Sequence, residues 1–444
     1  MQSVDRYSPF ALFVIFIASC GGFLFGYHTA IISGVLGLLA NTFHLNVLQE
    51  GFLVSILLLG GVVGALFAGV LSDRWGRRNV MFLTTLIFLI GAVILAITAN
   101  YHLFLAARVI IGIGVGIASL VSPLYLAEVA PPHYRGRFVC LFQIMVAAGI
   151  LAAYGINALF AQQDSWRVVF WISLIPAGVQ LVGLFFIPES PGWLFRKGRP
   201  VPAEKALAVL RGDLEWKKHL SEMQMSGTRQ YGKRKWEKRL IFIITVGFLL
   251  SAFQQITGIN TVIYYAPTIF GHTGASSAES ALVATLAVGI ANFLVTFIAV
   301  WLIDKIGRRI LLLIGVLGMA VCLGMLIFVL QVEKHPLLAV ISVVGYVSFF
   351  ALSLGPVTWV VLSEIFPLQI RGFAMGLALF SNWFFNYIVS LTFLLLIQHW
   401  GISGTFALYT GISLLCFFFI FFCIPETKGK SLEEIEHMLT RRKV

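Results

Sequence analysis

The chain has 444 residues, of which 59% are hydrophobic and 11% are charged. Soluble domains carry about 25% charged residues, so this composition excludes a soluble globular protein and indicates a membrane protein. The formal charge of +12 does not indicate a nucleic-acid-binding protein, because the basic residues occupy short segments between apolar runs. The five cysteines lie inside apolar runs without the spacing of metal ligands, so we expect no metal or other cofactor.

Twelve apolar runs are long enough to cross a membrane as helices, since about 20 residues rising 1.5 Å each span a hydrocarbon core of roughly 30 Å. The first run is too long for a cleaved signal and is expected to be a permanent span. The predicted spans are 10–38, 50–71, 80–99, 103–126, 138–160, 168–187, 240–270, 279–303, 310–331, 337–363, 373–397 and 402–424.

A polar stretch divides these spans into two groups of six. It contains a candidate for a short amphipathic helix, Ala203 to Leu210. We therefore predict an all-α membrane protein of two six-helix halves. Its parts are an N-terminal half (1–187), a cytoplasmic linker with short helices (188–239), a C-terminal half (240–424) and a cytoplasmic tail (425–444).

Orientation follows from the distribution of Lys and Arg, because cytoplasmic loops are enriched in these residues. With both termini cytoplasmic, all but three of the 31 Lys and Arg residues lie on that side. The exceptions are Arg108, Arg167 and Lys334. We expect a monomeric, multi-pass protein of the plasma or inner membrane, embedded in the lipid bilayer, with cytoplasmic termini and no nucleic-acid partner.

An internal repeat relates the two groups of spans. Three short segments recur in the same order at nearly one offset, which is hard to obtain by chance. An even number of spans in each copy makes the repeats parallel, related by a pseudo-two-fold axis along the membrane normal. The matched positions are Asp73 and Asp304 (231 apart), Glu128 and Glu364 (236 apart), and Pro188 and Pro425 (237 apart).

These segments resemble the sugar porter family of the major facilitator superfamily over nearly the whole chain. Further matching segments are Pro188-Glu189-Ser190-Pro191, Gln254-Gln255-Ile256-Thr257-Gly258-Ile259-Asn260 and Pro425-Glu426-Thr427-Lys428-Gly429-Lys430. The family includes bacterial sugar/proton symporters and facilitative glucose transporters. The resemblance implies the major facilitator fold and alternating access around a central site for a monosaccharide such as glucose or xylose.

Charged residues gather at the predicted cytoplasmic ends of the spans. Ion pairs between the two halves would hold the inner side shut, and we expect these residues to form such a cytoplasmic gate. The alternative is topology together with solvated ion pairs worth under about 1 kcal/mol each. Gly192 stands where the family usually has Arg, which removes one inner charge. The gating candidates are Asp73, Arg74, Arg77, Arg78, Glu128, Arg135, Asp304, Arg308, Arg309, Glu364 and Arg371.

Polar side chains within the spans suit a sugar, since amides both donate to and accept from hydroxyl groups. Gln255 and Asn260 are five residues apart, so they reach one cavity only if the helix is broken, which Gly258 permits. The alternative role for such amides is hydrogen bonding between helices. By resemblance, the sugar contacts are Gln143, Gln254, Gln255, Asn260, Asn292, Trp359 and Asn382, supported by the aromatic residues Phe25, Tyr264 and Trp383.

Two departures from the family stand near this site. Asn382 occupies a position where sugar porters often have Gln, so its side chain is one methylene shorter. His28 occupies a position in the first span where proton-coupled members typically have Asp and facilitative members have a neutral residue. By resemblance, His28 and Arg108 are neighbours. All 19 acidic residues lie in loops, termini or near span ends, so His28 is the candidate proton carrier.

A neighbouring guanidinium and removal from water both disfavour a charged imidazolium. We therefore expect His28 to be neutral at pH 7 and transport to be facilitated or weakly proton-coupled. Proton symport through His28, at acidic external pH and with Arg108 displaced, stays open as an alternative. A packing or hydrogen-bonding role for His28 is a third possibility.

Other function classes fit the sequence less well. An enzyme is not expected, because the spans contain no carboxylate pair, no Ser-His-Asp grouping and no metal cluster. A non-transporting sugar sensor would keep the same fold and site. Such a protein is expected to have long signalling tails, yet about nine residues precede the first span and about twenty follow the last. Transport of a monosaccharide is therefore the favoured function, with protons as partners if transport is coupled.

Overall fold

A computed structural model describes residues 9–130, 135–160, 166–211, 238–273, 277–332, 335–367 and 370–429. Within these ranges, eleven helices are long and apolar enough to cross a membrane. The longest, α18 (Arg371–Cys423), contains the non-helical residue Gly401, at φ +69°. Gly401 lies between the eleventh and twelfth predicted spans, so the helices agree with the all-α, twelve-span prediction.

The N-terminal half is closely packed, because glycines let helix backbones approach each other. A Cβ at Gly26 would lie 2.0 Å from the carbonyl oxygen of Val146, and one at Gly112 would lie 1.9 Å from that of Leu57. These glycines bring α1 against α6 and α3 against α5. The helices are α1 (Pro9–Ala30), α2 (Ile32–Phe43), α3 (Val47–Trp75), α4 (Arg77–Ile97), α5 (Tyr101–Val129), α6 (Arg135–Leu159), α7 (Arg167–Ile172) and α8 (Leu174–Phe186).

The C-terminal half contains two interrupted spans. Gly258, at φ +91°, separates α12 from α13, and Ser353, at φ −126° and ψ −93°, separates α16 from α17. A backbone φ of +91° favours glycine, because an L-residue with a side chain is strained at that angle. Together with α18, the helices are α12 (Lys238–Ile256), α13 (Ile259–His272), α14 (Ala278–Ile306), α15 (Arg308–Val332), α16 (Pro336–Leu352) and α17 (Leu354–Ile365).

Two short helices of the predicted linker lie against the N-terminal half. They are α9 (Pro191–Arg196) and α10 (Pro200–Arg211), and α10 confirms the amphipathic helix predicted at Ala203 to Leu210. The rest of the predicted linker, 212–237, and the tail from residue 430 lie outside the described residues.

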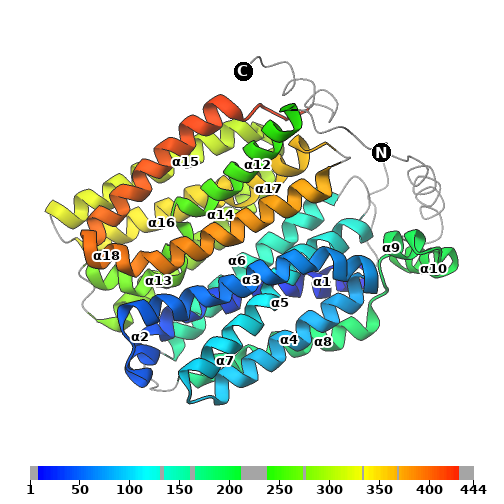
Figure 1. Cartoon of the computed structure of the whole chain (residues 1–444), viewed down its shortest axis with the longest axis horizontal. Helices are drawn as coiled ribbons and strands as arrows, with labels where there is room; N and C mark the ends of the chain where they lie inside the picture. The colour runs from blue at the N-terminus through cyan, green and yellow to red at the C-terminus, as the bar shows by residue number, and fades with distance from the viewer. Residues whose placement is uncertain are drawn as a thin grey trace.

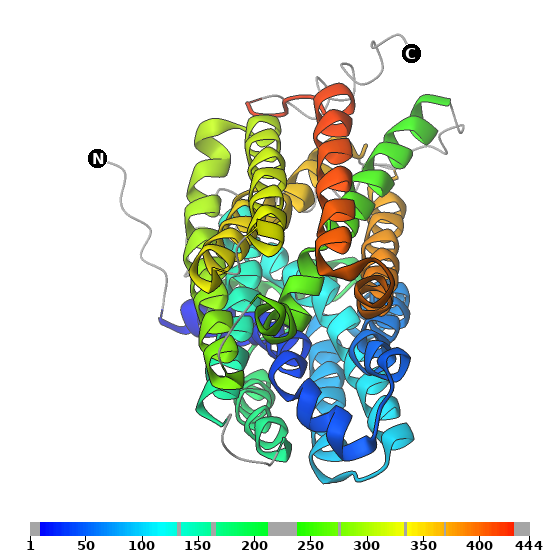
Figure 2. The same cartoon turned by 90° about the vertical axis from the view of Figure 1, so that its left-hand side faces the viewer.

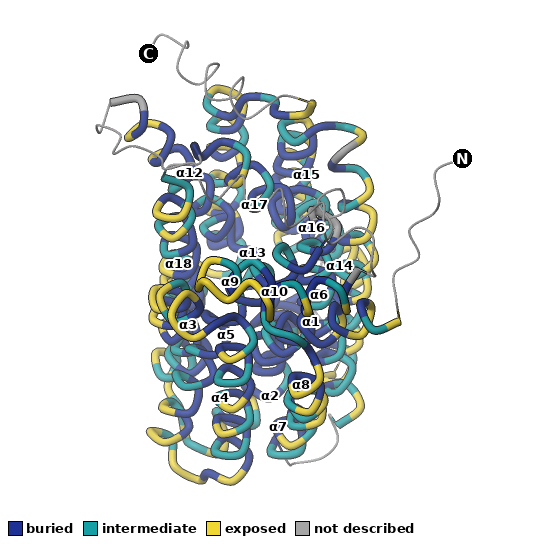
Figure 3. Tube along the Cα trace, turned by 90° about the vertical axis from the view of Figure 1, so that its right-hand side faces the viewer, coloured by how far each residue is buried: buried dark blue, intermediate teal, exposed yellow. Residues whose placement is uncertain are grey.

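The two halves lie side by side and join most closely at one end of the molecule. They meet where α3 packs on α18, α6 on α14, and α13 on α1 and α2. Figure 1 shows the two groups of helices together near α2 and α13, diverging toward the end that carries α9. We call these the α2 end, shown in Figure 2, and the α9 end, shown in Figure 3.

Large apolar side chains cover much of the outer surface. Examples are Val70 at 68% exposed, Phe185 at 65% and Phe422 at 66%. A soluble monomer rarely exposes extended apolar surface, whereas a protein embedded in lipid does. The exposed residues lie mainly on the outer sides of the bundle and the buried ones inside it (Figure 3). The surface therefore fits a chain surrounded by hydrocarbon.

Candidate functional site

The interruption of the seventh span brings two of the predicted amides together. The Asn260 side chain donates through Nδ2 to Oε1 of Gln255 at 2.6 Å. This contact depends on Gly258, because a Cβ at that position would lie 2.6 Å from the ring of Tyr409. The predicted break at Gly258 is confirmed. Among the described residues, the hydrogen bond between Asn260 and Gln255 leaves Nε2 of Gln255 and Oδ1 of Asn260 available for another partner.

A second amide pair joins three helices. Gln254 on α12 donates through Nε2 to the carbonyl oxygens of Leu354 at 2.6 Å and Gly355 at 3.2 Å, both in the first turn of α17. Its Oε1 accepts from Nδ2 of Asn382, on α18, at 2.6 Å. Both amides are buried. The Gln254 side chain is therefore engaged by protein groups at both of its polar atoms.

Aromatic side chains join the two halves. The rings of Phe25, on α1, and Trp383, on α18, have centroids 5.5 Å apart at an interplanar angle of 37°. Phe25 also lies 6.4 Å from the ring of Phe142. Trp383 packs on α3 at Gly61, where a Cβ would lie 2.7 Å from the ring. The indole Nε1 of Trp383 is buried without a hydrogen-bond partner in the described structure.

The remaining predicted contacts keep their polar groups free. Gln143 on α6, Asn292 on α14 and Trp359 on α17 are partly exposed. Within the described residues, their side chains form no hydrogen bond with the other predicted contacts. They are partly exposed, and no described hydrogen bond joins them to the two amide pairs.

Asn386 contacts Tyr264, one of the predicted aromatic residues, although sequence reasoning did not select it. Its Nδ2 donates to the Tyr264 hydroxyl at 3.3 Å, and its Oδ1 accepts from the Ser390 hydroxyl at 3.2 Å. Asn386 follows Asn382 by one helical turn, so it shares a face of α18 with that residue. A polar residue repeated at this spacing within an apolar span was the available signal.

His28 and Arg108 are neighbours, and both are buried. Arg108 donates to three backbone carbonyl oxygens: to His28 at 3.0 Å, to Leu53 at 3.4 Å and to Val54 at 3.2 Å. The imidazole of His28 stacks on the ring of Phe88, with centroids 5.4 Å apart. Neither ring nitrogen has a hydrogen-bond partner among the described residues. The arginine contacts the backbone of His28 rather than its side chain.

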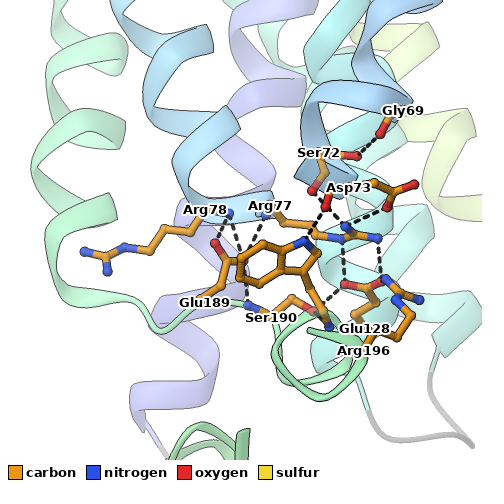
Figure 4. Close-up of polar contacts among 10 residues, drawn as sticks. Gly69, Ser72, Asp73, Arg77, Arg78, Glu128, Glu189, Ser190 and Arg196 are labelled. Atoms are coloured by element: carbon orange, nitrogen blue, oxygen red, sulfur yellow. Dashed lines mark hydrogen bonds and ion pairs between the residues drawn. The ribbon is translucent and has the colours of Figure 1, made fainter. Parts of the chain in front are cut away.

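At the α9 end, Arg77 is held by two carboxylates of its own half (Figure 4). Its Nη1 donates to Asp73 and its Nε to Glu128, both at 2.9 Å. The linker helix α9 joins the same cluster, since Arg196 donates to Glu128 at 2.8 Å and Ser190 also donates to Glu128. The indole N–H of Trp193 on α9 also donates to the carbonyl oxygen of Asp73 at 2.9 Å, so the linker is attached to both α3 and α5.

The acid of each repeated Pro-Glu segment caps the helix that follows the Gly-Arg-Arg turn. Glu189 accepts from the backbone N–H groups of Arg77 at 2.9 Å and Arg78 at 3.1 Å. Glu426 accepts from those of Arg308 at 3.0 Å and Arg309 at 3.1 Å. Carboxylates at helix N-termini satisfy unpaired N–H groups and complement the helix dipole. The two halves use the same contact, as expected for a repeat.

These two carboxyl groups differ in their acidity. Burial raises the pKa of Glu189 despite its backbone donors. Burial also raises the pKa of Glu426, but four backbone N–H groups outweigh it, and the pKa lies below the usual value. Glu426 is therefore the more strongly stabilised anion.

The described ion pairs of Arg77 and Arg308 lie within one half, and the ion pairs expected between the halves stay a prediction. In the C-terminal half, Arg308 lies 3.1 Å from Glu364, and both belong to that half. Arg371 donates to the carbonyl oxygen of Phe366 at 3.1 Å, and Arg74 is exposed. Because the halves diverge at the α9 end (Figure 1), Arg77 and Arg308 pair within their own halves. The side chains of Arg135 and Asp304 lie outside the described residues.

Comparison with known proteins decides the family. The family model described as "Sugar (and other) transporter" matches residues 14–439. The chain belongs to this family. It is therefore a transporter rather than an enzyme, and a multi-pass membrane protein.

Related proteins match over nearly their full lengths. The chain is 39% identical to the probable metabolite transport protein CsbC of Bacillus subtilis, over 97% of this chain and 94% of that protein. It is 37% identical to the glucose transporter GlcP of Staphylococcus epidermidis (97% and 98% covered) and 35% identical to the galactose-proton symporter of Escherichia coli (97% and 94%).

A solved structure shares the fold. The inward open conformation of the xylose transporter XylE from E. coli superposes with a TM-score of 0.85 at 34% identity, over 96% of this chain and 99% of that one. The similarity supports the two-half major facilitator architecture predicted from the repeat.

Proposed function

We propose that this protein carries a monosaccharide across the membrane by alternating access. The observation that carries the proposal is the broken seventh span, which leaves amide groups of Gln255 and Asn260 free for a ligand. It is supported by Trp383, whose ring contacts Phe25 of the other half. Amides bind sugar hydroxyls and aromatic faces cover the apolar side of the ring. Gln143, Asn292 and Trp359 complete the proposed site. The sugars named for relatives, glucose, galactose and xylose, support a hexose or pentose.

We place the α9 end in the cytoplasm, with the protein as a monomer in the plasma membrane. The cluster of arginines at that end supports this orientation, because cytoplasmic loops are enriched in Lys and Arg. The divergence of the halves there, and the match with an inward open structure, support an inward-facing state. In the outward-facing state, we expect the gating residues to form pairs between the halves.

For the energy source, we favour facilitated or weakly coupled transport. A proton on His28 would place a second cation beside Arg108 at a fully buried position where neither ring nitrogen has an acceptor. Burying an unpaired charge is costly, so the neutral imidazole is preferred. Arg108, held by three backbone carbonyl oxygens, does not require an anionic partner at His28 to stay in place.

Proton symport through His28 is the second candidate, and the name of one relative favours it. The galactose-proton symporter of E. coli is 35% identical over 97% of this chain. In this scheme His28 takes up a proton when the α2 end opens to water and Arg108 moves away, and it releases the proton on closure.

Uptake into proteoliposomes tests the function and separates these candidates. Labelled glucose, xylose, galactose and fructose are supplied with and without an inward proton gradient. Facilitated transport predicts saturable uptake that stops at equal concentrations, whereas accumulation driven by the gradient would refute it. Saturable binding without uptake of any of the four sugars would indicate a sensor. We expect a His28→Asp variant to gain dependence on the gradient.

A further inference from the structure

The interruption of the seventh span leaves one backbone carbonyl without its helical donor. In a continuous helix, the carbonyl oxygen of Thr257 would accept from the N–H group of Thr261, four residues later. Instead, the N–H and the hydroxyl of Thr261 both donate to the carbonyl oxygen of Gly258, at 3.1 Å and 2.7 Å. Thr257 is fully buried, and buried carbonyl groups are nearly always paired. The carbonyl of Thr257 therefore needs a donor from another part of the chain.

Tyr346, on α16, supplies that donor. Its hydroxyl donates to the carbonyl oxygen of Thr257 at 2.9 Å, from a residue 89 positions away in the sequence. Tyr346 is 1% exposed, so this hydrogen bond is closed to bulk water. Without the hydroxyl the carbonyl would be left buried and unpaired, which costs more free energy than an ordinary hydrogen bond contributes. The tenth span therefore stabilises the break in the seventh.

A second tyrosine packs on the other residue of the break. A Cβ at Gly258 would lie 2.6 Å from the ring of Tyr409, in the part of α18 that follows Gly401. Tyr409 thus leaves no room for a side chain at position 258, while Tyr346 pairs the preceding carbonyl. Each residue of the pair Thr257-Gly258 is held by a tyrosine from another span.

The geometry of this pair sets the positions of two amides of the proposed site. Gln255 precedes the pair and Asn260 follows it, and their side chains meet at 2.6 Å across the break. A change in the direction of the Thr257 carbonyl would rotate the backbone between them. The hydroxyl of Tyr346 is therefore placed to control the distance between these amides and the direction in which they point.

We propose that Tyr346 is a positioning residue for sugar binding, whose hydroxyl holds the Thr257 carbonyl and thereby sets the positions of Gln255 and Asn260. This role rests on the proposed function, because it acts through two amides assigned to the sugar. Tyr346 acts through the backbone of the break, and not through a contact of its own with the sugar. The tenth span thus takes part in recognition through α16 as well as through Trp359 on α17.

The substitution Tyr346→Phe tests this role, because it removes one oxygen atom and keeps the ring. The matched control is Tyr125→Phe, which removes an equally buried hydroxyl that donates to the carbonyl oxygen of Pro188 at 2.7 Å, away from the break. We expect the affinity of purified protein for D-glucose, or for D-xylose if glucose is not bound, to fall about two- to tenfold in Tyr346→Phe. In Tyr125→Phe it should stay within about twofold of the wild type. An unchanged affinity in Tyr346→Phe, or an equal fall in the control, would overturn the positioning role.

A double substitution shows whether Tyr346 acts through Gln255. Affinities are compared for the wild type, Tyr346→Phe, Gln255→Leu and the combined variant. If the hydroxyl positions Gln255, its removal should reduce affinity by a smaller factor in the Gln255→Leu background than in the wild type, because the two residues then serve one interaction. Equal factors in the two backgrounds would mean that Tyr346 acts independently of Gln255, which contradicts the proposal.

Hydrogen–deuterium exchange without sugar keeps this role separate from the proposed function. Tyr346→Phe should speed exchange of the amides in 255–261 about two- to tenfold and leave those in 28–34 unchanged, whereas Tyr125→Phe should change neither segment. If the wild type carries no monosaccharide, the proposed function fails, but faster exchange at the break is still expected. Exchange in 255–261 that does not change, or that rises equally in both segments, would show that the hydroxyl does not hold the break.

Discussion

Arg196 supplies the inner charge that is missing at Gly192. It donates to Glu128 at 2.8 Å, and the Glu128 carboxylate also accepts from Arg77 and Ser190. A Cβ at position 192 would lie 3.7 Å from the carboxyl carbon of Glu128, so an arginine there would reach the same group. Positions 192 and 196 are one helical turn apart on α9, so an arginine at either position would donate to the Glu128 carboxylate.

The expected size of this contact follows from its exposure. The side chain of Arg196 is 58% exposed and that of Glu128 is 13% exposed. Ion pairs of this kind are worth about 0.2–1 kcal/mol, because water and salt screen them. Arg196→Ala should therefore lower the melting temperature in detergent by roughly 0.2–1 °C at low salt. The matched control is Arg199→Ala, which removes an exposed arginine three residues later and should have no effect.

A second substitution separates the effect of the arginine charge on the melting temperature from the effect of replacing a glycine within the helix. Gly192→Arg in the Arg196→Ala background should restore the melting temperature. Replacing a glycine within a helix stabilises the folded protein by about 0.5–1 kcal/mol even without a new charge. Gly192→Ala in the same background is therefore the necessary comparison. At 1 M salt, where the Debye length is about 3 Å, the difference between Arg and Ala at position 192 should disappear. Equal rescue by Ala and Arg, or a difference that persists at 1 M salt, would refute the role of charge.

Three further substitutions probe other parts of the structure. Because the pKa of Glu426 lies below its usual value, the stabilisation it supplies is present above the usual carboxyl pKa and is lost on acidification. Glu426→Gln should thus flatten the fall in melting temperature between about pH 5 and 3. Tyr154→Phe removes a 2.7 Å hydrogen bond to the carbonyl oxygen of Ile263, across the halves. It should shift the population two- to tenfold toward opening at the α2 end, measured by spin-label distances. Gly258→Ala should reduce both stability and uptake, because φ is +91° there, whereas Gly271→Ala, in open space on the same helix, should not.

Much of the fold could be predicted because it depends on composition and periodicity. The apolar runs predicted twelve spans, and Gly401 falls between the last two of them. The break at Gly258 was predictable because glycine tolerates positive φ and because two amides flank it. The break at Ser353 also has a sequence signal, because Gly355 and Pro356 follow it. A proline has no N–H to donate to the carbonyl oxygen four residues earlier, at Leu352, and its ring clashes with that carbonyl.

The site could be predicted as a set of residues but not as a set of contacts. Helix rotation decides which groups Gln254 contacts, and residue spacing alone does not reveal that rotation. The same limit applies to the inner charges. Pairs between the halves belong to one conformation, whereas this structure has Arg77 and Arg308 paired within their own halves. A sequence pattern specifies which residues take part and leaves the conformational state open.

The two repeats interrupt their first spans at related positions, but to different degrees. Ile31 and Gly258 are 227 positions apart, close to the repeat offset. At Ile31 the backbone N–H still donates four residues back, to Tyr27 at 2.9 Å, so the helical ladder continues. At Gly258 the N–H donates only three residues back, to Gln255 at 2.9 Å, and a new helix begins. The interruption at Gly258, in the C-terminal half, is therefore less well held by helical hydrogen bonds than the one at Ile31.

Hydrogen–deuterium exchange tests this difference. The first N–H groups of a new helix lack a helical acceptor, so local opening costs less there. We expect amides in 255–261 to exchange faster than those in 28–34. We also expect a transported sugar to slow exchange in the first segment more than in the second, because Gln255 and Asn260 flank the break. Equal exchange in the two segments, or equal protection by sugar, would mean that the break at Gly258 is as rigid as the continuous helix at Ile31. Bending of the C-terminal half would then have no part in transport.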